Sequence, residues 1–181
     1  CLCSEKQMWA GRVYCEASMH TQTGNWFLTP TYSDDQYPDQ GLDPKHLSDF
    51  IKRLRYHGLV EKFFACGEYG GKTARGHYHV LAMGMPIDID QMTVVGQSNG
   101  MKLYDHPKIT KLWGKGHCPI GVMTEGSIFY VSKYIQKLLT AEELGERHPE
   151  FRRMSQGLGL DFVKKYWPQL VAHDAILVPK P

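Results

Sequence analysis

The sequence lacks the features that would assign it to a membrane or to a disulfide-stapled fold. No apolar run approaches the about 18 consecutive residues from which a transmembrane helix is inferred, so we expect no membrane span. The five cysteines are an odd number without framework-like spacing, which favours free thiols in a reducing compartment. The formal net charge is only +2, so charge by itself does not indicate a nucleic-acid partner.

Motifs of several large enzyme classes are also missing. The helical H-E-x-x-H pair of many zinc proteases is absent, and so is the phosphate loop of P-loop NTPases. We expect no serine or cysteine nucleophile elbow either. The sequence contains no internal repeat and no low-complexity segment. We therefore expect a single domain over residues 1–170, followed by a C-terminal tail over residues 171–181.

The local patterns that are present predict an α+β fold. A hairpin is expected at the centre, because two apolar strands flank the glycine-rich basic turn GGKTARG. An antiparallel sheet with helices packed on it follows from that hairpin, rather than a doubly wound parallel sheet. Pro30 lies within a further strand and predicts an edge position or a bulge there. Helices are expected over residues 4–20, 43–57, 108–113, 124–139 and 160–167, and strands over residues 26–32, 59–69, 77–84 and 118–124.

The hairpin contains a candidate metal site. Side chains two apart on a strand point to the same face, so His77 and His79 present two imidazoles side by side, with Tyr78 on the other face. Glu68 lies just before the turn, where a cross-strand neighbour of the histidines is expected. Two imidazoles and a carboxylate suit Mn²⁺, Mg²⁺ or Zn²⁺, with positions left for water or substrate. The competing interpretation is a histidine pair half-buried in a sheet without a metal.

A second constellation lies in FYVSKYIQK, residues 129–137. Tyr130 and Tyr134 are four residues apart and share a face of the predicted helix, and Lys133 and Lys137 follow them at equal spacing. A phenol has a pKa near 10 and becomes a nucleophile when a metal or a cation favours its anion. The competing interpretation is a pair of tyrosines at the edge of the core with solvated hydroxyls.

The metal site and the tyrosines together indicate attack on a phosphodiester. A metal polarises a phosphate oxygen, and a tyrosine oxygen attacks in line to give a covalent phosphotyrosine that preserves the bond energy for rejoining. Two other functions fit the same residues. One is a non-catalytic, RRM-like single-stranded nucleic-acid-binding module whose tyrosines stack bases, and the other is a metal hydrolase that uses water as its nucleophile.

Four segments resemble the replication initiator proteins of small single-stranded DNA phages, of the gokushovirus type within the microviruses. These proteins are HUH endonucleases, in which a bulky apolar residue separates two histidines; here Tyr78 fills that position. The resemblance covers most of the chain, from the first helix to about Trp167. The segments are FLTPTYSDDQYP, FFACGEYGGKTARGHYHVLAMG, YVSKYIQK and HPEFRRMSQGLGLDF.

The resemblance implies a fold, a reaction and a set of site residues. The fold would be a ferredoxin-like or RRM-like sheet, and the activity would be nicking of the viral strand at the origin. The protein would keep the 5′ end and leave a free 3′-OH that primes rolling-circle replication. Mn²⁺ or Mg²⁺ would be the cofactor, single-stranded DNA and the host replication helicase or polymerase the partners, and the host bacterial cytoplasm the location. The implied residues are Glu68, His77 and His79 as metal ligands, Tyr130 and Tyr134 as nucleophiles, and Lys133 and Lys137 beside the scissile phosphate.

A nicking enzyme must also hold single-stranded or melted DNA, which calls for cationic grooves and aromatic stacking platforms. Suitable residues occur in the hairpin turn, on the predicted helix over residues 43–57, and in the loop before that helix. They are Lys72 and Arg75, then Lys52, Arg53 and Arg55, and finally Tyr32 and Tyr37. The competing interpretation for each is an ordinary surface charge or a loop aromatic.

Overall fold

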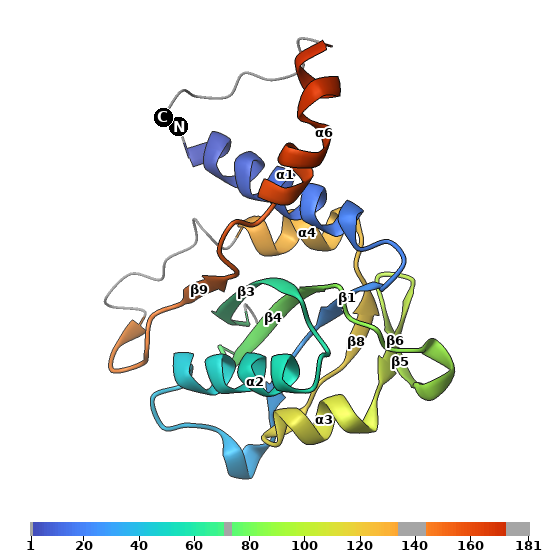
Figure 1. Cartoon of the computed structure of the whole chain (residues 1–181). Coiled ribbons are helices and arrows are strands. Elements are labelled where there is room, and N and C mark those ends of the chain that lie inside the picture. Colours follow the sequence, from blue (N-terminus) through green and yellow to red (C-terminus); the bar gives the residue numbers. More distant parts are fainter. Residues whose placement is uncertain (1, 71–73, 134–143, 173–181) are drawn as a thin grey trace.

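The computed structural model describes residues 2–70, 74–133 and 144–172. In these ranges the chain forms a nine-stranded antiparallel sheet that does not close, together with five α-helices (Figure 1). The predicted α+β class with a central antiparallel sheet is therefore confirmed. None of the helices in these ranges combines the length and apolarity that crossing a lipid bilayer requires.

The predicted hairpin lies at the centre of the sheet. It consists of β3 (Lys62–Tyr69) and β4 (Gly76–Met83), which pair without interruption along their whole length. Both strands are buried over almost every residue, because helices cover both faces of the sheet.

Four short strands continue the sheet beyond β4. They are β1 (Asn25–Leu28), β2 (Thr31–Tyr32), β7 (Gly116–His117) and β8 (Ile120–Val122). Both β1 and β2 pair with β4, and on their other side β1 pairs with β8 and β2 with β7. The predicted edge position of Pro30 is therefore wrong, because Pro30 lies between two interior strands. It breaks the strand instead, since proline has no N–H to donate, while its carbonyl accepts the Tyr78 N–H at 3.0 Å.

The face that we call the back face is covered by α2 (Pro44–Tyr56) and α3 (Pro107–Trp113). Each helix starts with a proline and a capping side chain: Asp43 accepts the Lys45 N–H at 2.7 Å, and His106 accepts the Lys108 N–H at 3.2 Å. The apolar side chains of both helices then meet the sheet in one core. That core includes Leu47, Phe50, Leu54, Ile109, Trp113, Tyr32, Tyr78, Val80 and Ala82.

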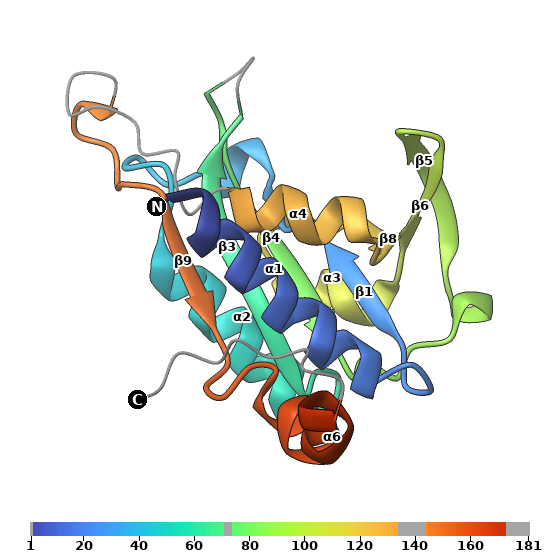
Figure 2. The same cartoon turned by 90° about the horizontal axis from the view of Figure 1, so that it is seen from above.

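The opposite face, the front face, is covered by α1 (Leu2–Met19) and α4 (Glu125–Lys133), as Figure 2 shows. Thr124 caps α4, because its Oγ1 accepts the Ser127 N–H at 3.2 Å while Ser127 Oγ accepts the Thr124 N–H at 2.9 Å. The predicted continuation of this helix to residue 139 lies outside the described residues. The front core includes Ala10, Val13, Phe64, Cys66, Leu81, Ile128 and Val131.

Residues 93–105 form a hairpin that the sequence patterns did not predict. It pairs β5 (Thr93–Ser98) with β6 (Met101–Asp105) through a turn at Asn99-Gly100, and every residue of β5 is exposed. The stretch GQSNG within it fits G-x-S-x-G. It is a hairpin turn, however, rather than the strand-to-helix turn of a nucleophile elbow, so the expected absence of an elbow holds for this segment.

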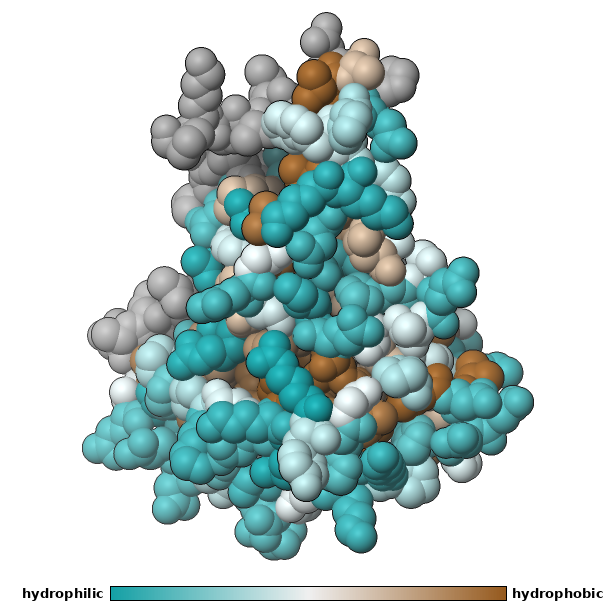
Figure 3. Space-filling view, viewed as in Figure 1, coloured by the Kyte–Doolittle hydropathy of each residue, from teal (hydrophilic) through white to brown (hydrophobic). Residues whose placement is uncertain are grey.

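The C-terminal part adds β9 (Phe151–Met154) at the edge of β3, and α6 (Leu160–Ala172), which packs on α1. Helix α6 crosses the predicted boundary at residue 170, and residues 173–181 lie outside the described ranges. Exposed apolar side chains gather on α6 and on the β5–β6 hairpin, within a largely hydrophilic surface (Figure 3).

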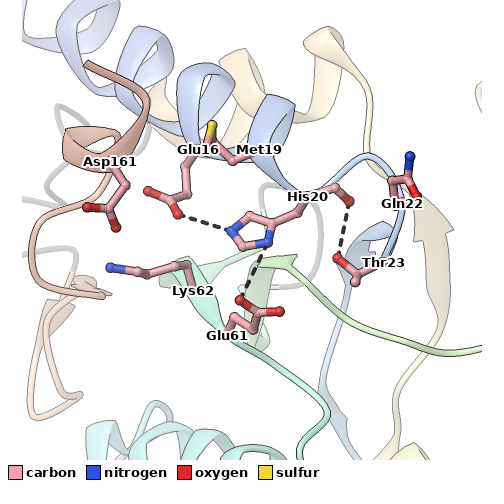
Figure 4. Close-up of a pocket in the computed structure, with 8 residues that line it drawn as sticks. All are labelled: Glu16, Met19, His20, Gln22, Thr23, Glu61, Lys62 and Asp161. Atoms are coloured by element: carbon pink, nitrogen blue, oxygen red, sulfur yellow. Dashed lines mark hydrogen bonds and ion pairs between the residues drawn. The ribbon is translucent and has the colours of Figure 1, made fainter. Parts of the chain in front are cut away.

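A polar clasp, made by Glu16, His20 and Glu61, holds the start of α6 to α1 (Figure 4). The buried carboxylate of Glu16 accepts the Gly159 N–H at 2.7 Å through one oxygen and contacts His20 Nε2 at 3.1 Å through the other. His20 Nδ1 lies 3.7 Å from Glu61, just before β3. The clasp therefore joins three segments that are far apart in the sequence.

Candidate metal centre and tyrosine

The β3–β4 hairpin places Glu68, His77 and His79 together on the front face. Glu68 is paired with His77 in the strand register, and His79 projects from the same face two residues further along β4. One carboxylate oxygen, Glu68 Oε1, lies 3.0 Å from His77 Nε2 and 2.8 Å from His79 Nε2. The three groups offer ligand atoms that all lie within 4.8 Å of one another.

This donor set fits a divalent cation. Two imidazole nitrogens and one carboxylate oxygen are ligands that Mn²⁺ and related ions accept, and their convergence does not depend on any distant segment. His77 Nδ1 donates to the carbonyl of Arg75 at 3.1 Å, which orients the ring and turns Nε2 toward Glu68. Thr29 Oγ1 lies 3.5 Å from His79 Nδ1 and orients the second ring in the same way.

The two histidines differ in their protonation. Burial disfavours the charged form of His77, but the hydrogen bond to Glu68 and the contact with the Arg75 carbonyl outweigh it, so the pKa of His77 is raised. Burial dominates at His79 and lowers its pKa, although Glu68 opposes that effect. A metal would therefore displace a proton from His77 more than from His79.

The walls of the centre are apolar and hold the second histidine in place. Phe27 stacks on His79 with the ring centroids 5.1 Å apart and the planes 15° apart. Cys66 is buried beside His79 in the strand register, and burial raises the pKa of its thiol well above the ordinary value. The Cys66 thiol is therefore neutral, and the ligand set is the carboxylate with the two imidazoles.

Helix α4 brings a tyrosine into this set of groups. The Tyr130 hydroxyl donates to Glu68 Oε1 at 3.1 Å, so the phenol and both histidines contact the same oxygen. Its ring meets the His79 ring edge-on, with the centroids 5.3 Å apart. Tyr130 is 41% exposed, so its hydroxyl reaches the buried groups while the residue stays open to solvent.

The remaining predicted catalytic residues are described only in part. Lys133 is exposed in the last turn of α4, on the helix that carries Tyr130. Tyr134, Lys137 and the turn residue Lys72 lie outside the described residues.

The predicted DNA contacts on the second helix lie away from the metal centre. Lys52, Arg53 and Arg55 are on α2, which covers the back face. Lys52 pairs with Asp49, Arg53 donates to the Leu112 carbonyl at 2.7 Å, and Arg55 donates to Ser155 Oγ at 3.0 Å. Both arginines thus join α2 to neighbouring segments, and the structure does not bring the three cations to the histidines.

Two predicted loop residues and one arginine meet beside the hairpin turn. Arg75 pairs with Asp34 at 2.9 Å and lies over the Tyr37 ring, 4.6 Å from its centroid. Tyr37 Oη accepts the N–H of Gly76 at 2.9 Å. The prediction for Tyr32 is wrong: it is only 2% exposed and belongs to the back core, so its ring is not available to stack a base.

Sequence reasoning missed Thr29 as a partner of the metal centre. The signal was present, because Thr29 is two residues after Phe27 and so shares its face in an extended segment. Pro30 obscured that alternation, since it suggested that the strand leaves the sheet at this point.

An open antiparallel sheet with helices on both faces and a Glu/His/His group on its central hairpin is consistent with the fold of the HUH endonucleases. The chain belongs to the replication-associated protein ORF2 family, whose model matches residues 25–139, more than half of the chain. This family match covers the metal centre and Tyr130.

Three phage proteins show the same relationship over nearly the whole chain. The chain is 30% identical over 98% of its length to the replication-associated protein ORF2 of Spiroplasma virus 4, and 33% identical over 98% to the replication-associated protein ORF4 of Chlamydia phage 1. It is 29% identical over 93% to the replication-associated protein VP4 of Bdellovibrio phage phiMH2K. The chain spans 59%, 47% and 56% of these relatives, about half of their length. No solved structure matches the chain.

Proposed function

We propose that this protein initiates phage DNA replication as a metal-dependent endonuclease and strand transferase that cuts single-stranded DNA with Tyr130. One observation carries the proposal: the Tyr130 hydroxyl donates to Glu68 Oε1, the same oxygen that both histidines contact. A nucleophile for phosphoryl transfer must lie at the group that binds the phosphate, and this phenol does. The names of the phage relatives support a role in replication.

Glu68, His77 and His79 would hold the metal. When bound there, a divalent cation such as Mn²⁺ or Mg²⁺ would supply positive charge to the scissile phosphate and to developing oxygen charge. The protein's own part is to fix the three ligands on a rigid hairpin and to aim the phenol. The buried surroundings of His79 and Glu68 keep bulk water from these groups, which strengthens electrostatic interactions inside the site.

The reaction transfers one phosphodiester bond to the protein. Tyr130 Oη forms a bond to phosphorus as the bond from phosphorus to the 3′ oxygen breaks. The phenol loses its proton and the departing 3′ oxygen gains one, so protons and charge balance. The 5′ phosphate stays on the tyrosine, and the free 3′-OH serves as a primer. Tyr134, four residues further on, would make the second cut that releases the completed circle.

Cations near the phenol would hold the DNA phosphates. Lys133 lies one turn along α4 from Tyr130, and Lys137 has the same spacing from Tyr134. Lys72 and Arg75 belong to the turn of the hairpin that carries the ligands. We expect these side chains to contact phosphates beside the cut, in the cytoplasm of the bacterial host where the phage DNA is copied.

The position of Tyr130 separates this proposal from the two other functions. A hydrolase that activates water does not need a phenol hydrogen-bonded to its ligand carboxylate. A purely binding module needs tyrosine rings that face the solvent, whereas the Tyr130 hydroxyl points inward to Glu68. Both alternatives still make distinct predictions in a single experiment.

A denaturing gel tests the proposal. The protein is incubated with Mn²⁺ and a labelled single strand from the phage intergenic region, and covalent transfer appears as a protein band carrying the label. We expect the band with the wild type and its disappearance on metal removal with a chelator. The Tyr130→Phe variant should give a markedly weaker band, and Tyr14→Phe, an exposed tyrosine on α1, should match the wild type. Cleavage without a labelled protein band would indicate a water nucleophile, and binding with neither cleavage nor band would indicate a binding module.

A further inference from the structure

A row of polar side chains leads from the candidate metal centre toward an outer strand. The strand register pairs Glu68 with His77, His77 with Thr31, and Thr31 with His117, across β3, β4, β2 and β7. Directly opposed residues of neighbouring antiparallel strands project from the same face of a sheet. All four side chains therefore belong to the front face, on which the metal ligands lie.

The burial of the flanking residues confirms this assignment. Tyr32 follows Thr31 and Cys118 follows His117, and both Tyr32 and Cys118 are buried in the back core. Because successive residues of a strand alternate between faces, Thr31 and His117 must face the other way.

Exposure increases along the row. The Glu68 side chain is 3% exposed and the His77 side chain 21%, Thr31 is half-buried, and His117 is exposed. Two strand spacings separate β4 from β7, which places His117 about 10 Å from His77. The row thus forms a polar strip that begins at the buried ligands and opens to solvent within the span of a short stretch of DNA.

The strand that carries His117 is held firmly against its neighbour. Gly116 has φ +134°, and a Cβ atom at this position would lie 2.3 Å from the Ser33 N atom, so only glycine permits this approach. Ser33 N–H also donates to the Lys115 carbonyl at 2.9 Å, and Trp113 Nε1–H donates to the Thr31 carbonyl at 3.0 Å. His117 is therefore presented from a fixed position rather than from a mobile loop.

We propose that this row is the floor along which single-stranded DNA runs to or from the metal centre, and that the His117 imidazole hydrogen-bonds the DNA backbone. This inference rests on the proposed function, because it extends the same site. An exposed imidazole donates to phosphate oxygens, and the neighbouring Thr31 and His77 add polar groups without further negative charge. A narrow strip one residue wide suits one strand better than a duplex.

The first test measures binding without cleavage. All proteins carry Tyr130→Phe, so that covalent capture does not distort the affinity, and the probe is a fluorescein-labelled single strand of about 16 nucleotides. His117→Ala should weaken binding about fivefold to tenfold, the value of one hydrogen bond to a charged or polar group. His117→Gln should recover most of that loss, because its amide still donates. His57→Ala, an exposed histidine that ends α2 beside the back face, serves as the matched control and should bind normally.

The second test observes the contact itself. In protein labelled with ¹³C-histidine, the imidazole signal of His117 should shift as the same strand is added and should saturate with the fluorescence affinity, while the His57 signal stays in place. Unchanged affinity in His117→Ala, or a stationary His117 signal at saturation, would overturn the inference. Recovery by His117→Phe instead of His117→Gln would replace the hydrogen bond with base stacking and would also overturn it. Because neither test needs cleavage, a failure of the nicking chemistry remains distinguishable from a failure of this contact.

Discussion

Glu68→Gln is expected to remove metal binding while preserving the fold. The substitution keeps the shape of the side chain and removes its charge. Glu68 is 2% exposed, and its Oε1 contacts His77 at 3.0 Å, His79 at 2.8 Å and Tyr130 at 3.1 Å. It is the anionic member of the ligand group, so the variant would offer a divalent cation two neutral imidazoles and an amide.

The expected loss is large enough to measure directly. Substituting a residue that only orients a ligand costs about 10–100-fold in metal affinity. Glu68 would be a ligand itself and would supply the negative charge, so we expect a loss of at least about 100-fold, or about 2.7 kcal/mol. Isothermal titration with Mn²⁺ measures this value, and circular dichroism without metal checks that the variant is folded.

A second signature follows from the protonation of His77. The contact with Glu68 outweighs burial and raises the His77 pKa, so in Glu68→Gln burial should prevail and the His77 pKa should fall. A histidine NMR titration measures it. The control is Glu125→Gln, which removes an exposed carboxylate from the helix that carries Tyr130. Unchanged Mn²⁺ affinity in a folded Glu68→Gln protein would refute Glu68 as a ligand.

Three further predictions address the ligands and the clasp. His79→Ala should abolish nicking in Mn²⁺ while circular dichroism shows a folded domain, and normal nicking would exclude His79 from the site. Because the His77 pKa is raised, protons should compete with Mn²⁺ as the pH falls through a midpoint above the ordinary value of about 6.5; a pH series of titrations with a midpoint below that value would contradict the assignment. Glu16→Ala should leave the Gly159 N–H unpaired at a cost of about 1–3 kcal/mol and release α6, which hydrogen exchange over residues 160–172 would detect, and unchanged protection there would show that the clasp is dispensable.

The parts of the site that were predictable are local in sequence. The period-two spacing of His77 and His79 and the nearby Glu68 sit on one hairpin, so strand geometry alone places them on a common face. The contact of Tyr130 with Glu68 joins residues 62 positions apart and depends on how α4 crosses the front face. Helix periodicity predicted the helix but not its direction over the sheet, so this contact required the structure.

The parts of the fold that were missed had weak or conflicting signals. Asn99-Gly100 is a strong hairpin signal, and both residues have positive φ, 48° and 79°. The flanking strands are almost wholly exposed and Gly96 interrupts the first of them, so no alternation of apolar and polar residues marked them. Tyr32 was interpreted as a loop aromatic because a proline precedes it and an acidic loop follows, whereas its place in β2 turns it into the core.

The covalent bond between Tyr130 and DNA is the central claim, and peptide mass spectrometry of the trapped adduct tests it most directly. Wild-type protein is reacted with single-stranded phage DNA in Mn²⁺ and digested with nuclease and protease, and the modified peptides are sequenced. The expected result is a nucleotide 5′-phosphate on Tyr130, with Tyr134 modified in the Tyr130→Phe variant. DNA attached to any other residue, or cleaved DNA with no modified peptide, would contradict the account.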